Sequence, residues 1–196
     1  MDNLDEKIIA LRNQNLKKQN SNIETGVYIN NTLVEFAEQS VLDDQFTILI
    51  PSCFEEMSPE DARLKYPSEQ RPQHIVTTQD TSVNLCISLL DVPASNDQTP
   101  QNVLEMKSIL KMTNPATEFF ESGLEALEDF DLAWFEYKSF AIDGQIYNIM
   151  FTASAYDKML HGAFNCTFGH QDAWRDPALQ MLKSIKLSKK GGNNNA

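Results

Sequence analysis

The chain has 196 residues, of which 41% are hydrophobic and 22% are charged, and its formal charge at pH 7 is −12. A chain of this length can bury about 70% of its unfolded surface, and the composition is typical of a globular domain, which excludes a chain disordered throughout. The negative charge argues against nucleic acid, because phosphate binding needs a basic stripe. We expect a protein partner that is basic or amphipathic, and we leave the oligomeric state open.

Residues 1–22 have the pattern of an amphipathic helix followed by a polar linker. Leu4, Ile8 and Leu11 recur at helical spacing, with acidic residues early and lysines late, as the helix dipole favours. The first residues are acidic where a secretory signal would be basic, and no apolar run reaches the roughly 18 residues that cross a bilayer. We expect an extra N-terminal helix, no membrane span and a cytoplasmic location with reduced cysteines.

From residue 32 the apolar period becomes strand-like. Two runs, at 32–41 and 45–51, are separated by a short polar turn and predict a hairpin. A short helix is predicted next, because Ser58 can act as its N-cap, Pro59 suits the first helical position and Pro67 stops it.

The segment YPSEQRPQ, residues 66–73, connects this helix to a predicted strand at 74–78, whose hairpin partner is 82–91. Arg71 and His74 have two interpretations. They could line the rim of a small-ligand or hydrolase pocket between the sheet and a polar loop at 91–100, or they could be the polar rim of a connector. We favour the connector, because no second catalytic partner lies nearby in the sequence.

A helix begins at Thr99-Pro100 and stops at Asn114-Pro115. Five apolar residues form its broad face: Val103, Leu104, Met106, Ile109 and Leu110. After it, Asp143-Gly144 between two apolar-rich runs predicts a hairpin, because a type I′ turn needs positive φ at both central residues. The next run alternates, which predicts a third consecutive strand.

The chain closes with a predicted helix from about Asp172, which turns Trp174 inward, and a short strand at 185–187. Residues 189–196 read as a flexible tail. The expected architecture is a single α+β domain over residues 23–188, with a mostly antiparallel sheet of about six or seven strands flanked by helices.

The order of these segments resembles the PsbP/DcrB-like α/β/α sandwich superfamily. The segments that carry the resemblance are FTILIP, YKSFAIDGQIYNIMF, GAFNCTF with its Trp-containing helix, and SIKL. PSCFEEMSPEDARLKYPSEQRPQHI also looks like segments of uncharacterised small proteins of low-GC Gram-positive bacteria. The resemblance covers roughly residues 32–188 and implies a role in binding, since the understood members are a photosystem subunit, a factor that binds a small GTPase and secretion chaperones. It supplies no catalytic residues, and the N-terminal helix is not part of the shared fold.

Metal, cofactor and catalytic signals are weak. The densest group of potential ligands is His161, Cys166, His170 and Asp172, but strand alternation places His161 and Cys166 on opposite faces. Cys53 has no neighbouring base in sequence that would activate its thiol. We assign no catalytic, cofactor or metal residues, and we expect a protein that is not an enzyme.

The strongest charge feature is an acidic run at residues 118–131. It reads either as a solvated face or as an acidic rim around apolar anchors that would dock a basic or amphipathic partner. We assign five possible partner-binding residues to it: Glu118, Phe120, Glu121, Glu125 and Glu128. The sequence thus supports a non-catalytic binding or adaptor protein, with a small-ligand protein or hydrolase at Arg71 and His74 as the alternative.

Overall fold

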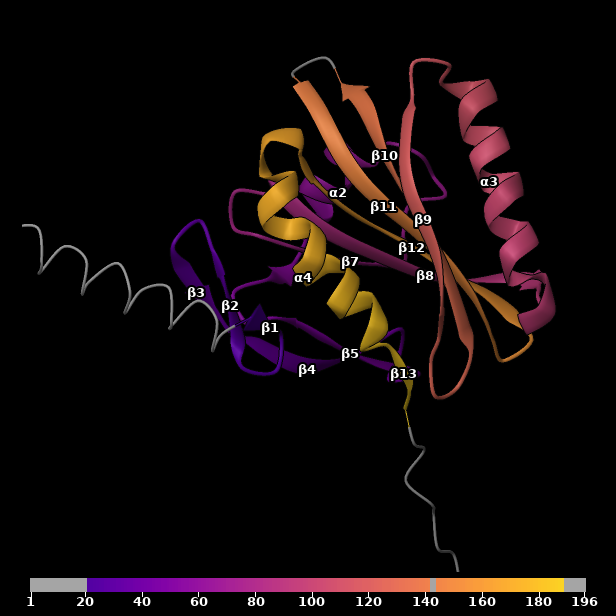
Figure 1. Cartoon of the computed structure of the whole chain (residues 1–196), viewed down its shortest axis with the longest axis horizontal. Coiled ribbons are helices and arrows are strands. Elements are labelled where there is room, and N and C mark those ends of the chain that lie inside the picture. Colours follow the sequence, from indigo (N-terminus) through magenta and orange to yellow (C-terminus); the bar gives the residue numbers. More distant parts are fainter. Residues whose placement is uncertain (1–20, 142–143, 189–196) are drawn as a thin grey trace, which may run out of the picture.

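The computed structural model describes residues 21–141 and 144–188 (Figure 1). The helix expected within residues 3–19 and the tail expected at 189–196 lie outside the described residues. None of the helices in the described part has the length and apolar character that a membrane crossing needs. The elements follow in this order: β1 (Ser21–Asn22), β2 (Gly26–Ile29), β3 (Thr32–Val34), β4 (Phe36–Val41), β5 (Phe46–Pro51), β6 (Glu55–Glu56), α2 (Pro59–Lys65), β7 (His74–Thr77), β8 (Val83–Pro93), η1 (Asn96–Gln98), α3 (Thr99–Thr113), β9 (Glu118–Ala126), β10 (Asp131–Ala141), β11 (Gly144–Ala155), β12 (Lys158–Thr167), η2 (Phe168–His170), α4 (Gln171–Lys183) and β13 (Lys186–Leu187).

A seven-stranded sheet forms the centre of the molecule. Its strand order is β6-β7-β8-β12-β11-β10-β9, and every neighbouring pair is antiparallel. The predicted α+β class, with a mostly antiparallel sheet of six or seven strands flanked by helices, is confirmed. The hairpin predicted at Asp143-Gly144 is the β10–β11 pair, in which Ala141 lies opposite Gly144. Gly144 is therefore the first residue of β11 and not a turn residue, and Asp143 lies outside the described residues.

The first hairpin belongs to a separate small sheet. β4 and β5 pair as predicted, but their third strand is β13 at the end of the chain, and they do not join the central sheet. Residues 32–34, expected in the same strand as β4, instead form β3 and pair with β2. β2 also pairs with β1, on the side away from β3. The end of the predicted linker, residues 21–22, is therefore a strand of the β1-β2-β3 sheet.

Two layers cover opposite faces of the central sheet. On one face, α2 packs Ala62 against Ile75, and α3 packs Val103 against Phe135. On the other face, α4 and β5 share one large core with the sheet, to which they contribute Phe46, Ile48, Ile50, Trp174, Ala178, Met181 and Leu182. The molecule is therefore a sandwich in which α4, viewed in Figure 1 in front of the sheet, lies opposite α2 and α3.

The start of α2 follows its predicted local signal, whereas the loop predicted after β8 is shorter than expected. The Asp61 backbone N–H donates to the Ser58 side chain at 3.1 Å, which confirms the predicted cap of α2. The loop predicted at 91–100 is wrong in its first part, because β8 continues to Pro93 and Lys158 Nζ pairs with Asp91 Oδ1 at 3.1 Å. The rest of that stretch is the 3₁₀ turn η1 and the start of α3.

Gly162 in the middle of β12 allows an unusually close approach of its neighbours. A Cβ atom at this position would lie 2.3 Å from the Phe151 ring and 2.4 Å from the carbonyl oxygen of Cys86. The oxygen is a backbone atom of the adjacent strand β8, so it cannot rotate away. Glycine is thus required here by packing.

We predict that Gly162→Ala lowers the free energy of unfolding by about 3 kcal/mol, because the added methyl group overlaps a strand backbone and a buried ring. Gly169→Ala is the matched control, because a Cβ there meets no atom within 4 Å. Urea unfolding of both variants provides the measurement. Equal stabilities for the two variants would contradict this account of the packing at β12.

Candidate partner-binding surface at strand β9

The acidic run at residues 118–131 folds as an edge strand and the turn after it. The sequence assigned no strand to this run, whereas the structure has β9 paired with β10. Within residues 21–141 and 144–188, β9 has a neighbouring strand on that side only, because it ends the strand order. The structure brings together on this edge and turn all of the predicted partner-binding residues: Glu118, Phe120, Glu121, Glu125 and Glu128.

A β-bulge determines which way the β9 side chains point. The register between β9 and β10 shifts around Glu136, so Phe120 and Glu121 together lie opposite this one residue. The Phe120 ring is 6.2 Å from that of Phe168, just before α4, and Glu121 reaches Arg175 on α4. The bulge therefore turns two successive side chains toward α4, where a regular strand would turn only one.

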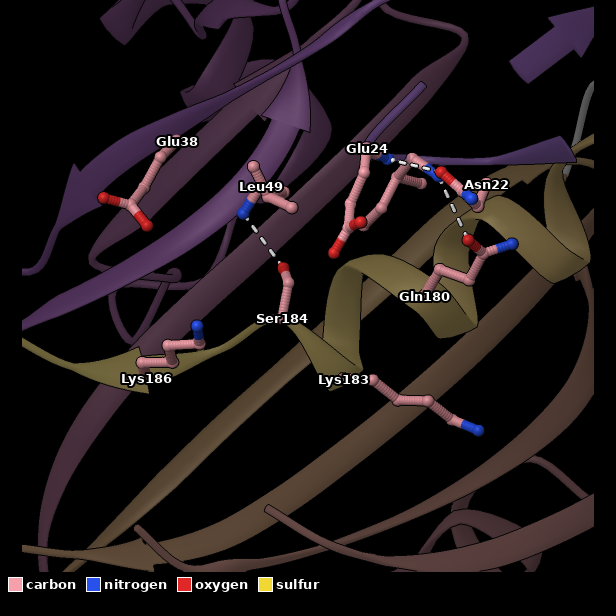
Figure 2. A pocket seen from close by; sticks show the side chains of 9 residues that line it. Asn22, Glu24, Glu38, Leu49, Gln180, Lys183, Ser184 and Lys186 are labelled. Atoms are coloured by element: carbon pink, nitrogen blue, oxygen red, sulfur yellow. Dashed lines mark hydrogen bonds between the residues drawn. The ribbon is translucent and has the colours of Figure 1, made fainter. Parts of the chain in front are cut away.

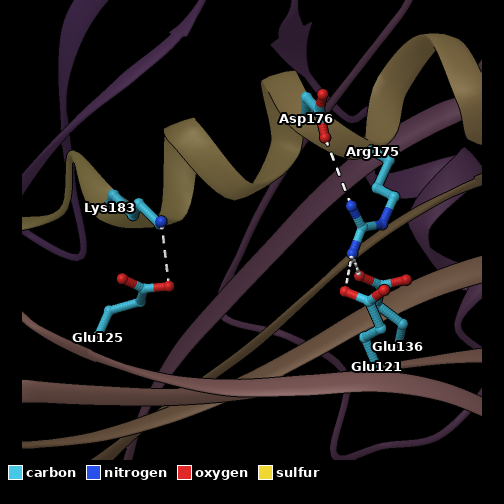
Figure 3. A network of polar contacts seen from close by, with 6 residues as sticks. All are labelled: Glu121, Glu125, Glu136, Arg175, Asp176 and Lys183. Atoms are coloured by element: carbon cyan, nitrogen blue, oxygen red, sulfur yellow. Dashed lines mark hydrogen bonds and ion pairs between the residues drawn. The ribbon is translucent and has the colours of Figure 1, made fainter.

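Arg175 joins α4 to the edge of the sheet. Its Nη2 atom lies 2.7 Å from Glu136 Oε1 and 2.6 Å from Glu121 Oε2, and its Nη1 atom lies 3.5 Å from Asp176 Oδ1 (Figure 3). The Glu136 side chain is only 1% exposed, whereas that of Glu121 is 73% exposed. The cluster thus reaches from the core to the surface.

The electrostatics of this cluster follow from the buried carboxylate. The hydrogen bond to Glu136 and the negative charges of Glu136 and Glu121 raise the pKa of Arg175. Burial, together with the adjacent Glu136 carboxylate, raises the pKa of Tyr147. Arg175 therefore stays charged and Tyr147 stays neutral near pH 7, and neither group is poised for proton transfer.

Three other carboxylates of the run, those of Glu118, Glu125 and Asp129, also have partners within the chain. Lys138 Nζ lies 2.7 Å from Glu118 Oε2. Figure 3 shows the second pair, in which Lys183 Nζ of α4 lies 3.0 Å from Glu125 Oε1. The Leu187 backbone N–H donates to Asp129 Oδ2 at 2.9 Å. The run is therefore the seam along which α4 and β13 attach to the sheet edge, as well as a charged surface.

Apolar side chains are exposed on the same edge. Phe120 is 39% exposed and Leu124 is 52% exposed, while Glu128 lies exposed in the turn after β9. We call the β9 surface the set formed by Glu118, Phe120, Glu121, Leu124, Glu125 and Glu128. This surface combines partly exposed apolar anchors with a rim of carboxylates, of which Glu118, Glu121 and Glu125 are held by ion pairs.

Sequence reasoning missed Arg175 and Glu136, the two residues that organise this surface. A signal for Glu136 was present, since it follows Leu132 and Trp134 at every second position of β10, where alternation demands an apolar side chain. A charge at such a position needs a partner in the fold. The sequence does not say that the partner lies on α4.

His74 lines a pocket of 520 Å³, but Arg71 does not. The lining residues are Leu42, Asp43, Gln45, Glu56, Gln73, His74, Leu89 and Lys158. Arg71 Nε instead donates to the Tyr66 carbonyl oxygen at 3.3 Å. Burial lowers the pKa of His74, although the nearby Glu56 opposes the shift. The pocket therefore lies beside the β4–β5 turn and not beside the loop at 91–100, where the sequence placed it.

A second pocket, of 450 Å³, lies between the start of the described chain and the end of α4 (Figure 2). Ser184 Oγ accepts the Leu49 N–H at 2.9 Å, and Gln180 Oε1 accepts the Ile23 N–H at 3.1 Å, so side chains of α4 and of its C-cap residue hold both walls. Its charged lining residues are Glu24, Glu38, Lys183 and Lys186. Among the described residues that line this pocket, both signs of charge occur and no nucleophile is paired with a base.

The cysteines and histidines do not form a site in the described part of the chain. Leu160, Gly162, Phe164 and Cys166 alternate as buried residues of β12, which places His161 on the opposite face from Cys166, and no group of three metal-ligating residues is found there. Burial raises the pKa of the Cys86 thiol to about 11 and that of Cys166 to about 12. These two thiols are thus protonated at pH 7, while Cys53 is exposed.

We predict that Arg175→Met lowers the free energy of unfolding by about 3 to 5 kcal/mol, because it leaves the Glu136 carboxylate buried without a partner. Glu121→Gln is expected to cost less than about 1 kcal/mol, because its side chain is mostly exposed. The double variant Arg175→Met/Glu136→Met should recover most of the loss. Urea unfolding at constant salt measures all three, and equal losses for Arg175→Met and Glu121→Gln would refute the assignment of Glu136 as the central group.

No family model matches the sequence, and no curated protein matches it. Solved structures are similar in fold. Cyanobacterial PsbP (CyanoP) from Synechocystis sp. PCC 6803 is 11% identical with a TM-score of 0.56, over 83% of this chain and 94% of that one. LpqN of Mycobacterium tuberculosis is 10% identical with a TM-score of 0.52, over 86% of this chain and 98% of that one. A Bacteroides thetaiotaomicron protein is 13% identical with a TM-score of 0.53, over 79% of this chain and 49% of that one. The part of the sequence resemblance that concerns the fold is confirmed: the chain has a PsbP-like fold.

Proposed function

We propose that this chain is a non-catalytic accessory domain that binds a basic or amphipathic protein partner through the β9 surface. The observation that carries the proposal is the edge strand itself, on which exposed Phe120 and Leu124 lie among carboxylates. Apolar anchors surrounded by a charged rim are the usual arrangement of a protein-binding surface. The cytoplasm is the proposed location, in keeping with three free thiols.

Fixed carboxylates favour binding over a merely solvated face. Glu118, Glu121 and Glu125 are each held by a cation of β10 or α4, so they lose little side-chain entropy when a partner arrives. Glu121 nevertheless remains 73% exposed and can accept a further donor. The PsbP-like fold supports an accessory role only by analogy. A fold that is shared at such low identity does not specify a site.

The pocket at His74 supports a second candidate, a small-ligand role. His74 Nε2 is buried and has no hydrogen-bond partner among the described residues, although it lies beside Glu56, Gln73 and Lys158. A polar group of a ligand would satisfy this nitrogen. The observed pocket includes His74, as the sequence hypothesis expected. Its basic lining residue is Lys158 instead of the expected Arg71.

We predict that a protein partner captured from a lysate of the source organism is retained by the wild-type chain and lost by Glu121→Gln/Glu125→Gln/Glu128→Gln. The matched control is Glu35→Gln/Glu60→Gln/Glu69→Gln, which removes the same charge from exposed residues outside β9 and α3. The tag is placed after Ala196, and the retained proteins are identified by mass spectrometry at moderate salt. Equal retention by the three chains, or no stoichiometric partner for any of them, would overturn the proposal.

For the second candidate, we predict that a ligand found by thermal-shift screening raises the Tm of the wild type and of Arg71→Gln by the same amount, because Arg71 is not in the pocket lining. The shift should disappear in His74→Gln. A shift that survives in His74→Gln, or a screen without any hit, would remove this pocket from consideration.

A further inference from the structure

We propose that the partner binds β9 as an added β-strand, through an extended segment in which basic and apolar side chains alternate. The inference rests on the proposed function and specifies its binding mode. β9 spans nine residues and, within the described ranges, pairs on one side only. Alternate backbone N–H and C=O groups of such a strand point away from its neighbour and can pair with another chain.

The opposite edge of the sheet offers much less. It is formed by β6, which has only two residues, Glu55 and Glu56. On β9, the five residues 122–126 pair with β10 in a regular register, and the bulge lies just before them. An added strand therefore has a regular stretch of five residues to pair with, next to the fixed carboxylate of Glu121.

The two faces of this edge differ in chemistry. On the α4 face, Glu121 and Glu125 are two regular pleats apart, separated by Gly123, over which the Trp134 ring lies. Partner side chains that point to this face meet carboxylates, so basic residues fit here.

On the α3 face, the strand presents Ser122 and Leu124. Lys107 Nζ of α3 lies 3.5 Å from Ser122 Oγ, and it excludes further basic side chains by charge repulsion. Leu104, three residues before Lys107 on the same flank of α3, is 57% exposed. Partner side chains on this face therefore meet Leu124 and Leu104, and apolar residues fit. In Figure 1, α3 lies beside β9 along this edge.

Charge argues against a second copy of this chain as the occupant. β9 has the sequence EFFESGLEA, with three carboxylates and no basic residue. Pairing β9 with itself would place like charges along a shared edge, which destabilises cross-strand pairs. A basic extended segment places opposite charges there instead.

The probe is a labelled peptide of alternating lysine and valine, long enough to span residues 122–126, titrated into the full chain and followed by fluorescence anisotropy. Two derivatives carry N-methyl groups on either the lysine or the valine amides. In strand addition only one of these sets of N–H groups points at β9, so one derivative should bind at least about tenfold more weakly and the other should bind like the parent. A peptide of the same composition with its lysines and valines in separate blocks should also bind more weakly.

Failure of the binding mode and failure of the proposed function are distinguishable. If both N-methyl derivatives bind alike while Glu121→Gln/Glu125→Gln weakens binding, the β9 surface stands and strand addition is overturned. If Glu121→Gln/Glu125→Gln binds the parent peptide as tightly as the wild type does, the β9 surface is wrong as well. Absence of any binding by the parent peptide overturns the proposed pattern of partner side chains. Thermal unfolding of the double variant verifies that it is folded.

Discussion

One buried carboxylate determines how the last helix meets the sheet. Glu136 occupies an inward position of β10, is 1% exposed and is the one charged residue among the described residues that are buried. An unpaired charge at such a depth costs several kcal/mol, so the fold must bring a cation to it. Arg175 is that cation, and its place on α4 fixes the rotation of the helix about its axis.

The remaining contacts of α4 follow from this rotation. With Arg175 directed at the sheet edge, Trp174 and Ala178 pack into the core. At the far end of the helix, Ser184 holds the β5 backbone, and β13 pairs with β5. The small sheet is therefore tied to the same helix that reaches the edge of the large sheet.

The same interaction prepares the β9 surface. The bulge opposite Glu136 lets Glu121 share the Arg175 guanidinium, so a single group connects the core, the helix and the exposed edge. Lys183 and Lys138 fix the neighbouring carboxylates in the same way. Among the described residues this strand edge is open, and carboxylates held in place there are consistent with the specific extended partner that we propose.

Much of the fold could be predicted from the sequence, because its signals are local. The cap at Ser58 fixes the start of α2, and alternation fixes which face of β12 carries Phe164 and Cys166. The assignment of strands to sheets could not be predicted, because β4 and β5 have no sequence feature that distinguishes a partner at β13 from one in the central sheet. This choice depends on packing across the whole chain.

The candidate residues of the β9 surface were grouped by the sequence, but the strand that carries most of them was not predicted. The acidic run showed Glu118, Phe120, Glu121, Glu125 and Glu128 as a group, yet its strand was missed. The bulge interrupts the alternation that identifies a strand, because Phe120 and Glu121 turn to the same side. Arg175 was missed because an ion pair between residues far apart in the sequence leaves no local pattern.

The most direct test of the account is residue-resolved amide hydrogen exchange across β9 in the full chain without a partner, by NMR. An open edge strand held by β10 predicts alternation along residues 122–126, with slow exchange for amides bonded to β10 and fast exchange for those that point outward. Uniformly slow exchange would mean that the edge is already covered, and uniformly fast exchange would mean that β9 is not a stable strand. Either of these results would contradict the central claim that β9 is a rigid, open edge prepared for a partner.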